Sequence, residues 1–377
     1  MQVEFFRHDL GPEEFDEVRT VLQSVFLTTA DKNLEFETNL ASYLGVRDTV
    51  TLSSCTAALH LAWIGLGIGT GDEVITTPLS FVASSNSVLL AGATPVFVDV
   101  EPLTGLLDID ASMSAVTSRT RAVLPVHLYG AMVDMKHLAV SARSLGLRIV
   151  EDAAHAVDSH LAGVRPGQWS DAACFSFYAT KAITSGEGGA LATQDESLSE
   201  LVRQLRNHGM TRGAADRYTK RFAHWDMEHL GWKYNMTNFQ AAMLLPQLRR
   251  IETNRLARIR AADYYAQRFD AAGVAHPHFG NDPSGHSHHL FTVWTDPLRR
   301  DDILTALQGK GVGVAVNFRP IHLTTYYRSR FGFRPGMFPE AERIGSSTIS
   351  LPLYPALTEA ELDFVATTVI QVLHSNF

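Results

Sequence analysis

Lys181 stands between a short apolar stretch and a glycine-rich turn. The apolar stretch covers residues 172–177, and the turn follows at 186–189. Burial at such a junction disfavours the charged ammonium, lowers the pKa of a lysine and allows it to form Schiff bases. A surface lysine in a hairpin turn has the same local pattern, so Lys181 by itself leaves both interpretations open.

Asp152 is a second candidate because it ends the strand-like stretch Arg148-Ile-Val-Glu-Asp. An aspartate at this point often caps the next helix. It can also act as a fixed anion that keeps a heteroaromatic cofactor nitrogen protonated. His155 follows three residues later, where it would support that contact or fill an ordinary structural role.

A possible anion site precedes both residues in the chain. Ser53-Ser54-Cys55-Thr56 lies between a predicted strand and an apolar helix. Free backbone N–H groups and the helix dipole attract anions there, although the hydroxyls also suit simple N-capping. Phe81 follows the next strand and is placed either to stack on a cofactor ring or to join the core.

Other site classes find no support in the motifs. There is no GxGxxG after the first strand and no GxxxxGK[ST], which are the usual nucleotide-binding fingerprints. No His, Cys and carboxylate residues have catalytic metal spacing, so we expect no metal.

The composition is that of an ordinary globular protein of 377 residues with 45% hydrophobic residues and a net charge of -8. No basic stripe predicts nucleic-acid binding, and no apolar run predicts a membrane span. The N-terminus lacks a signal-peptide pattern. Cys55 and Cys174 lie far apart in the sequence and lack metal-ligand spacing. We therefore expect them to be reduced thiols of a cytoplasmic protein.

The elements that must position these residues alternate between strands and helices. We expect strands at 49–52, 73–76, 95–99, 121–126 and 147–151, and helices at 13–26, 33–44, 57–66, 82–91 and 135–145. This alternation predicts an α/β fold with a mostly parallel sheet, whose ligands gather at the carboxyl ends of the strands.

A second domain is expected from about residue 250. A helical pattern runs from Thr237 past Ala262, followed by a strand at 289–294, a helix at 301–309, a strand at 313–316 and a final helix at 359–373. We therefore divide the chain into a large domain, 1–249, and a small α+β domain, 250–377.

The candidates occur in the order typical of a fold-type I enzyme dependent on pyridoxal 5'-phosphate (PLP), and longer strings agree. These strings are Ser54-Cys-Thr-Ala-Ala-Leu-His-Leu, Gly92-Ala-Thr-Pro-Val-Phe-Val-Asp-Val, Pro125-Val-His-Leu-Tyr-Gly, Glu151-Asp-Ala-Ala-His-Ala, Phe175-Ser-Phe-Tyr-Ala-Thr-Lys, Gly186-Glu-Gly-Gly, Tyr234-Asn-Met-Thr-Asn-Phe-Gln-Ala-Ala and Leu351-Pro-Leu-Tyr-Pro. From about Leu10 to the C-terminus the chain resembles the nucleotide-sugar aminotransferase family of the DegT/DnrJ type. The resemblance implies a large domain with a mostly parallel seven-stranded sheet and a smaller C-terminal domain.

The resemblance also implies roles for the candidates around PLP. Lys181 would bind the cofactor covalently, Asp152 would pair with its pyridinium nitrogen, and Phe81 would stack on its ring. His155 would lie near the other face of the ring or near O3′.

The remaining roles concern the phosphate. By the same resemblance Cys55, Thr56 and Ser176 hold the cofactor phosphate. Asn235 is similar to the residue that reaches the phosphate of the neighbouring subunit's cofactor, which implies a homodimer with shared active sites.

Two departures from the family pattern refine these expectations. Many members have Gly in place of Cys55, so any contact from Cys55 is expected through its backbone N–H. Many have Gln in place of His155. The His form, together with Thr184 and Lys233-Tyr-Asn, resembles the branch that aminates C4 of keto-sugars.

The resemblance therefore implies amino transfer from glutamate to a nucleotide-linked 4-keto-6-deoxysugar or 4-keto-pentose. An aminotransferase acting at C3 or on a keto-inositol would keep the same apparatus. A sugar dehydratase of the family normally has His in place of Lys181, and a regulatory relative would carry a DNA-binding region or a damaged site. Arg319, His322 and the turn at 208–209 are equally compatible with contact to the sugar and with structural roles.

Overall fold

The computed structural model describes residues 1–211, 224–279 and 285–375 and contains a seven-stranded sheet. Its strands lie in the order β1–β7–β6–β5–β4–β2–β3. They are β1 (Asp48–Leu52), β2 (Glu73–Thr76), β3 (Thr94–Phe97), β4 (Thr120–Leu124), β5 (Arg148–Asp152), β6 (Ala172–Ser176) and β7 (Gly189–Thr193). Only β7 runs antiparallel to its neighbours, with Gly189 opposite both Ser176 and Leu52. The expected mostly parallel seven-stranded sheet is confirmed.

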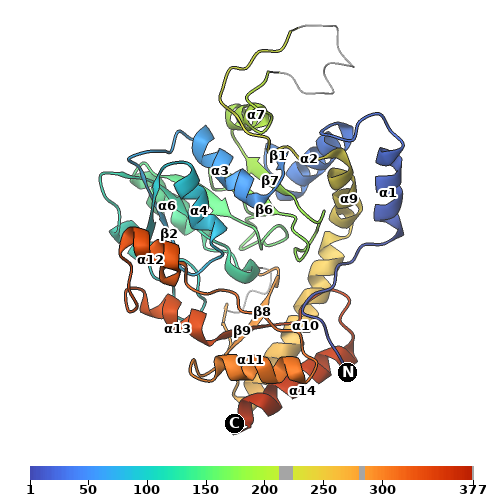
Figure 1. Ribbon diagram of the computed structural model, residues 1–377, viewed down its shortest axis with the longest axis vertical. Helices are drawn as coiled ribbons and strands as arrows, with labels where there is room; N and C mark the ends of the chain where they lie inside the picture. Colours follow the sequence, from blue (N-terminus) through green and yellow to red (C-terminus); the bar gives the residue numbers. More distant parts are fainter. Residues whose placement is uncertain (212–223, 280–284, 376–377) are drawn as a thin grey trace.

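Helices cover both faces of this sheet (Figure 1). They are α1 (Pro12–Leu22), α2 (Asp31–Leu44), α3 (Cys55–Gly65), α4 (Ala83–Leu90), α5 (Ile109–Ser114), α6 (Met135–Ser144), α7 (Glu196–Leu205) and α9 (Asn238–Arg249), with a short 3-10 helix at Leu128–Gly130. Strand β6 shows why both faces are needed, because all of its first four side chains are apolar and buried. Ala172 and Cys174 pack with α3 and α7, whereas Ala173 and Phe175 pack with α2 and α9.

A smaller antiparallel sheet pairs β8 (Phe291–Trp294) with β9 (Thr348–Leu351). It packs with α10 (Ile251–Ala272), α11 (Arg300–Gly309) and α14 (Glu359–His374) around a core that includes Phe269 and Val365. Figure 1 shows these helices below the large sheet. The division expected between residues 249 and 250 falls just before α10 begins at Ile251, and it stays a prediction.

Part of the C-terminal third returns to the large sheet. Helices α12 (Thr325–Phe331) and α13 (Pro339–Ser347) follow a 3-10 helix at Ile321–Leu323. The Tyr327 hydroxyl donates to Asn86 Oδ1 over 2.8 Å, and the backbone N–H of Ala341 donates to Asp99 over 2.8 Å. This packing on the large-sheet core was not expected from the sequence.

Two expected elements differ in detail. The long helical pattern beginning at Thr237 is broken at Arg250, whose φ of -105° and ψ of 10° separate α9 from α10. The expected strand at 313–316 is wrong, because only a single bridge joins Ala315 to Ser350. Along the described part of the chain, no helix combines the length and apolar character needed to cross a membrane.

Candidate active site

A cavity of about 530 Å³, called here the Lys181 cavity, lies at the carboxyl ends of β5 and β6 and the start of α3. Seven of the eight residues proposed from the sequence line it together: Cys55, Thr56, Phe81, Asp152, His155, Ser176 and Lys181. Asn235 is not among the lining residues. The fold therefore brings together residues that are more than one hundred positions apart in the chain.

Lys181 stands in the connection between β6 and β7, half-buried against the cavity. Its backbone N–H donates to the Tyr178 carbonyl oxygen over 2.9 Å, which closes the turn that carries the side chain. Burial lowers the pKa of its amine from 10.5 to about 8, and the neighbouring Cys55 and Asp152 oppose that shift. The uncharged amine is thus accessible near neutral pH.

Thr184 shapes the rest of this connection. Its hydroxyl donates to the Phe177 carbonyl oxygen over 3.2 Å and accepts from the Gly186 N–H over 3.0 Å. The Thr184 N–H donates to Gln247 Oε1 of α9 over 2.9 Å. These bonds fix the turn from which Glu187 enters the cavity wall.

Asp152 is buried at the end of β5 and accepts from three donors, one of which is the Cys55 thiol at 4.0 Å from Oδ1. The Ser84 hydroxyl donates to Oδ2 over 2.6 Å, and the Ala154 N–H donates to Oδ1 over 3.2 Å. Ser84 was missed by the sequence analysis, because a serine inside an apolar helix gives no signal of a distant carboxylate partner. Together these contacts orient the carboxylate toward the cavity, where it can pair with a cationic ring nitrogen.

The start of α3 forms a cradle suited to an anion. Ser54 caps the helix by accepting from the Ala57 N–H over 3.1 Å, while the N–H groups of Cys55 and Thr56 belong to the first turn and have no intrahelical partners. A Cβ at Gly189 would lie 2.3 Å from the Ser54 carbonyl carbon and 2.4 Å from the Cys55 nitrogen. Only glycine allows β7 to approach this turn so closely.

Cys55 itself remains a neutral thiol. Burial, together with the nearby Asp152 carboxylate, raises the pKa of its thiol well above 9.0. A neutral thiol gives an anion little stabilisation, so the backbone N–H is the group that would hold a phosphate.

Aromatic side chains form another part of the wall. The Phe81 ring is 59% exposed, and its centroid lies 6.1 Å from that of Phe318. His155 stacks on Phe318 at 5.8 Å with 13° between the rings and lies 4.3 Å from His289. Burial, Lys181 and His289 lower the pKa of His155 well below 6.5, so its imidazole is neutral. Its buried Nδ1 has no hydrogen-bond partner among the described residues and is left for a ligand.

Phe5, His289 and Phe318 are among the lining residues that the sequence analysis did not identify. They come from the N-terminal segment, the segment before β8 and the segment before α12. Each looks like an ordinary core or loop residue locally, and only tertiary packing places them beside Lys181.

Asn235 lies near the start of α9 and contacts the segment between α1 and α2. Its amide donates to the hydroxyls of Thr28 and Thr29 over 3.2 and 2.8 Å. The carbonyl oxygen of the preceding Tyr234 accepts from the Ser53 N–H over 2.7 Å. This hydrogen bond joins the Asn235 segment to the anion cradle at the start of α3.

The residues considered above as sugar contacts lie outside the Lys181 cavity. His322 is buried and hydrogen-bonded to Glu342 over 3.0 Å, and Arg319 donates to the Leu323 carbonyl oxygen. Neither lines the Lys181 cavity, and neither does the turn at 208–209.

Known proteins match this chain along nearly its whole length. The model of the DegT/DnrJ/EryC1/StrS aminotransferase family matches residues 8–370. The spore coat polysaccharide biosynthesis protein SpsC of Bacillus subtilis is 39% identical over 371 residues, covering 97% of this chain and 95% of that protein.

Solved structures agree with that match. The putative sugar aminotransferase Spr1654 of Streptococcus pneumoniae, in its pyridoxamine phosphate form, superposes with a TM-score of 0.93 at 29% identity, covering 98% of each chain. PseC of Helicobacter pylori, an aminotransferase of pseudoaminic acid biosynthesis, gives 0.93 at 28% identity, covering 99% of each chain. The chain belongs to the DegT/DnrJ/EryC1/StrS aminotransferase family.

Proposed function

We propose that this aminotransferase uses PLP to move an amino group from glutamate to a nucleotide-linked keto-sugar. The observation that carries the proposal is the convergence of Lys181, Asp152 and the start of α3 on one cavity of about 530 Å³. An amine, a carboxylate and an anion cradle complement the aldehyde, the ring nitrogen and the phosphate of PLP. Structures of Spr1654 exist in PLP and pyridoxamine phosphate forms, which supports the same cofactor here.

The residues present fit the cofactor. Lys181 would bind it covalently, Asp152 would pair with its ring nitrogen, and Cys55, Thr56 and Ser176 would hold its phosphate. Phe81 and His155 would contact its ring. When bound, PLP supplies an electron sink that stabilises negative charge at the carbon that loses a proton.

Lys181 is the proton-transfer group of this mechanism. The pKa of its free amine in the cofactor-free chain is about 8. Once released from the covalent bond to the cofactor, Nζ would therefore exist in both protonation states near neutral pH and could take up and return a proton. Asp152 keeps its carboxylate fixed through Ser84 and Ala154, so the charge opposite the ring nitrogen needs no rearrangement during reaction. Phe81 and Phe318 contribute apolar surface to the cavity wall.

The proposed substrate is more specific than membership in the family alone would imply. SpsC is named for spore coat polysaccharide biosynthesis and PseC for pseudoaminic acid biosynthesis, both of which involve sugars. We assign amination to C4 of a 4-keto-6-deoxysugar or 4-keto-pentose because His155, Thr184 and Lys233-Tyr-Asn resemble the branch of the family that acts there. Thr184 accepts from the Gly186 N–H in the turn that carries Glu187. Both cysteines are buried free thiols, which suits a cytoplasmic enzyme.

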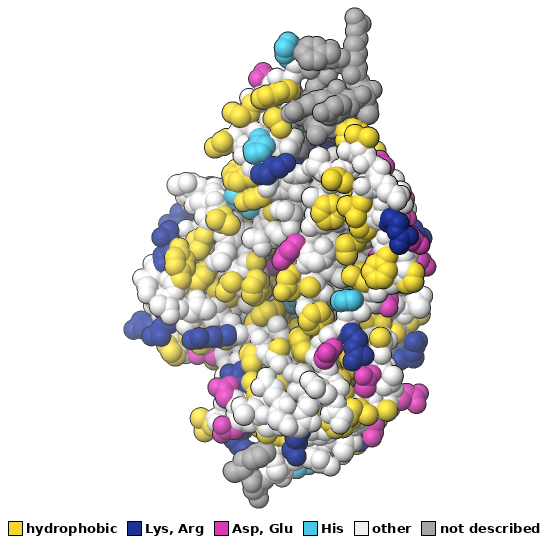
Figure 2. Space-filling model, turned by 45° about the vertical axis from the view of Figure 1, so that its right-hand side comes forward, with side chains coloured by type: hydrophobic (Ala, Val, Ile, Leu, Met, Phe, Trp, Pro, Cys, Tyr) yellow, Lys and Arg dark blue, Asp and Glu magenta, His cyan; other side chains and the backbone are white. Residues whose placement is uncertain are grey.

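We also propose a homodimer with shared active sites. Exposed apolar residues cluster on α1, α2 and their connection: Phe15, Leu22, Val25, Leu27 and Leu34. Figure 2 turns this side of the molecule forward and shows hydrophobic side chains along it. Asn235 contacts the same connection, so burial of this surface against a second copy places Asn235 at the interface.

An amino-transfer assay with glutamate against 4-keto and 3-keto nucleotide sugars tests the proposed reaction, with product NMR to locate the new amine. Borohydride reduction of the holoenzyme should attach the cofactor to the peptide containing Lys181. Nitrogen at C3 would move the enzyme to the alternative class, and a label on another lysine would refute the assignment of Lys181.

Subunit complementation tests the shared site. Asn235→Asp places a carboxylate against the partner's cofactor phosphate, and Lys181→Ala removes the base, so each homodimer should be inactive. A mixed dimer has one intact site, and activity should return on mixing. If subunit exchange is confirmed and the mixture of two inactive variants stays inactive, the cross-subunit role of Asn235 is wrong.

A further inference from the structure

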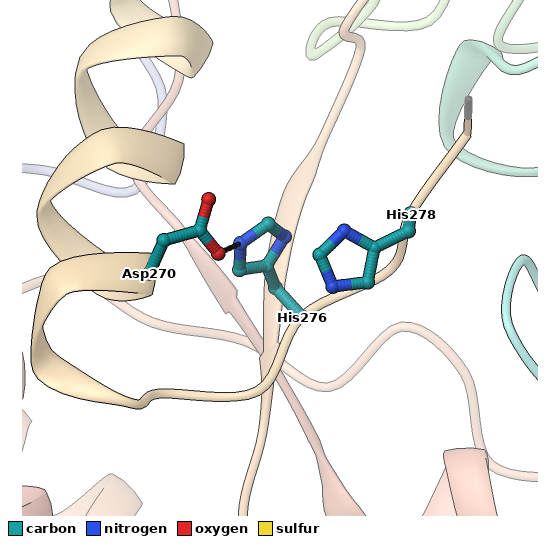
Figure 3. A group of neighbouring side chains, drawn as sticks. All are labelled: Asp270, His276 and His278. Atoms are coloured by element: carbon teal, nitrogen blue, oxygen red, sulfur yellow. Dashed lines mark hydrogen bonds and ion pairs between the residues drawn. The ribbon is translucent and has the colours of Figure 1, made fainter. Parts of the chain in front are cut away.

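Outside the Lys181 cavity, Asp270, His276 and His278 form a group whose ligand atoms all lie within 4.8 Å of one another (Figure 3). Asp270 lies in the last turn of α10, and Gly273, with φ of 67°, ends the helix and turns the chain. The extended segment that follows places His276 and His278 two residues apart, on the same side of the backbone. The centroids of their rings lie 4.6 Å apart with 42° between the ring planes. Figure 3 shows His276 between the Asp270 carboxylate and His278.

The hydrogen bonds of His276 determine which of its nitrogens is available. Nδ1 lies 3.1 Å from the Pro277 carbonyl oxygen, which can only accept, so Nδ1 carries the hydrogen. Nε2 then directs its lone pair toward Asp270 Oδ1, 3.0 Å away. Two acceptors at that distance require a cation between them, which is either a second proton on the imidazole or a metal ion.

We propose that Asp270, His276 and His278 bind a divalent transition metal ion of the zinc class. Two imidazoles and a carboxylate are a common ligand set for zinc, with a water molecule as the fourth ligand. The backbone carbonyl bonded to His276 Nδ1 is the usual outer partner of a metal-binding histidine. Sequence spacing alone had predicted no metal.

The geometry needs only small adjustments to accept the ion. Zinc bonds of about 2.0–2.1 Å in a tetrahedron place ligand atoms roughly 3.4 Å apart. The Asp270–His276 pair must open slightly from 3.0 Å, and His278 must move closer. Asp270 and His278 are exposed and free to make these movements, while buried His276 stays fixed.

The surroundings leave room for the water ligand. All three residues line a cavity of about 460 Å³ that also contains His286 and His288 in its wall. Burial lowers the pKa of His286 well below 6.5 and that of His288 to about 3, and the nearby Arg258 guanidinium adds to both shifts. Their imidazoles are therefore neutral, and they do not repel a cation.

The ion would connect a helix that packs on the small sheet with a segment that is hydrogen-bonded next to the large sheet. Asp270 belongs to α10, which packs on the small sheet, whereas the N–H of His278 donates to the Leu103 carbonyl oxygen over 3.1 Å. Leu103 lies beyond β3 of the large sheet. A ligand that binds only the folded arrangement stabilises it by mass action, so we expect a stabilising ion rather than a catalytic one.

Zinc titration of the tag-free holoenzyme, stripped with a chelator and followed by calorimetry, tests the site. We expect about one ion per chain with three protein ligands. Asp270→Asn and His278→Ala should each weaken binding about tenfold or more. Both residues are exposed, so these variants should fold. Zinc should raise the Tm of the wild type more than that of either variant.

Matched controls are Asp263→Asn, in the wall of the same cavity, and exposed His137→Ala. Both should bind zinc like the wild type. Anomalous scattering at the zinc edge should place the ion between Asp270 and His276. Absence of zinc binding, equal binding by Asp270→Asn and His278→Ala, or an ion located at Lys181 or Cys55 would overturn the proposal.

Discussion

One part of the Lys181 cavity wall is built from the ends of regular elements, and another part is built from loops. Asp152 and Ser176 end β5 and β6, and Cys55 and Thr56 begin α3, so backbone hydrogen bonding fixes their positions. His289 and Phe318 belong to segments outside the described helices and strands. The His289 N–H donates to the Tyr129 carbonyl oxygen over 3.0 Å, and Phe318 stacks on His155. We call the first the strand-end wall and the second the loop wall.

We infer that the strand-end wall serves the amino-transfer reaction and that the loop wall serves recognition of the sugar. The strand-end wall can hold charges within narrow limits, as amino-transfer chemistry requires. The loop wall can change shape and residues without disturbing the sheet, as recognition of different sugars requires. Substitutions in the two walls should therefore affect different kinetic constants.

The largest effect is expected at Lys181. Replacement by Ala removes the proton-transfer group, and kcat should fall by about 10⁴-fold. Exposed Lys136→Ala is the matched control and should retain wild-type turnover. Single-turnover amino transfer measures both, and near-normal rates in Lys181→Ala would remove this residue from the mechanism.

Asp152→Ala should lower kcat by about 10³-fold, since each tenfold loss corresponds to about 1.4 kcal/mol of barrier. PLP should still bind through its phosphate and Lys181, which absorbance of the purified variant would show. Ser84→Ala leaves the carboxylate in place but removes one donor, so its kcat should fall much less. Equal losses in the two variants would contradict a direct role for Asp152.

The free energy of unfolding should show how much the buried amine of Lys181 destabilises the cofactor-free protein. The pKa of Lys181 falls from 10.5 in the unfolded chain to about 8 in the folded one, which corresponds to roughly 3 kcal/mol of destabilisation. The penalty is complete below pH 8, where both states are protonated, and disappears as pH rises through 10.5. Cofactor-free Lys181→Met should therefore resist denaturant better than the wild type at pH 7 but not at pH 10.5.

Lys136→Met supplies the control for this comparison and should match the wild type at both pH values. An advantage of Lys181→Met that persisted at pH 10.5 would indicate better packing rather than relief of a buried charge.

The smallest effect is expected in the loop wall. Phe318→Ala removes apolar contact area, and KM for the keto-sugar should rise about tenfold, which is about 1.4 kcal/mol. Cofactor content and kcat should change little. Exposed Tyr326→Ala, outside the cavity, should leave KM unchanged. A large loss of kcat in Phe318→Ala would erase the distinction between the two walls.

The strand-end wall was predictable because its residues follow local rules. A run such as Arg148-Ile-Val-Glu-Asp predicts a strand, and parallel strands present their carboxyl ends at one edge. Cys55 and Thr56 follow a serine that caps an apolar helix. The order of these features matched a known family, which supplied roles that spacing alone left open.

The loop wall and the domain arrangement were not predictable in the same way. His289 and Phe318 reach the cavity only because distant helices pack, and no local pattern records that packing. The break at Arg250 was missed because apolar periodicity continues through it. The pairing of Asp270 with His276 depends on the turn at Gly273, which periodicity does not describe.

The reversed direction of β7 has a consequence for chain connectivity. Since β7 starts where β6 ends, the connection at 177–188 is a hairpin loop and not a helical crossover. Closing so short a loop costs little conformational entropy, and the lysine is tethered at both ends by paired backbone. The lysine is thus carried by a local hairpin, whereas the Asp152 carboxylate reaches the site through the parallel pairing of β5 with β6, which requires a longer connection between the two strands.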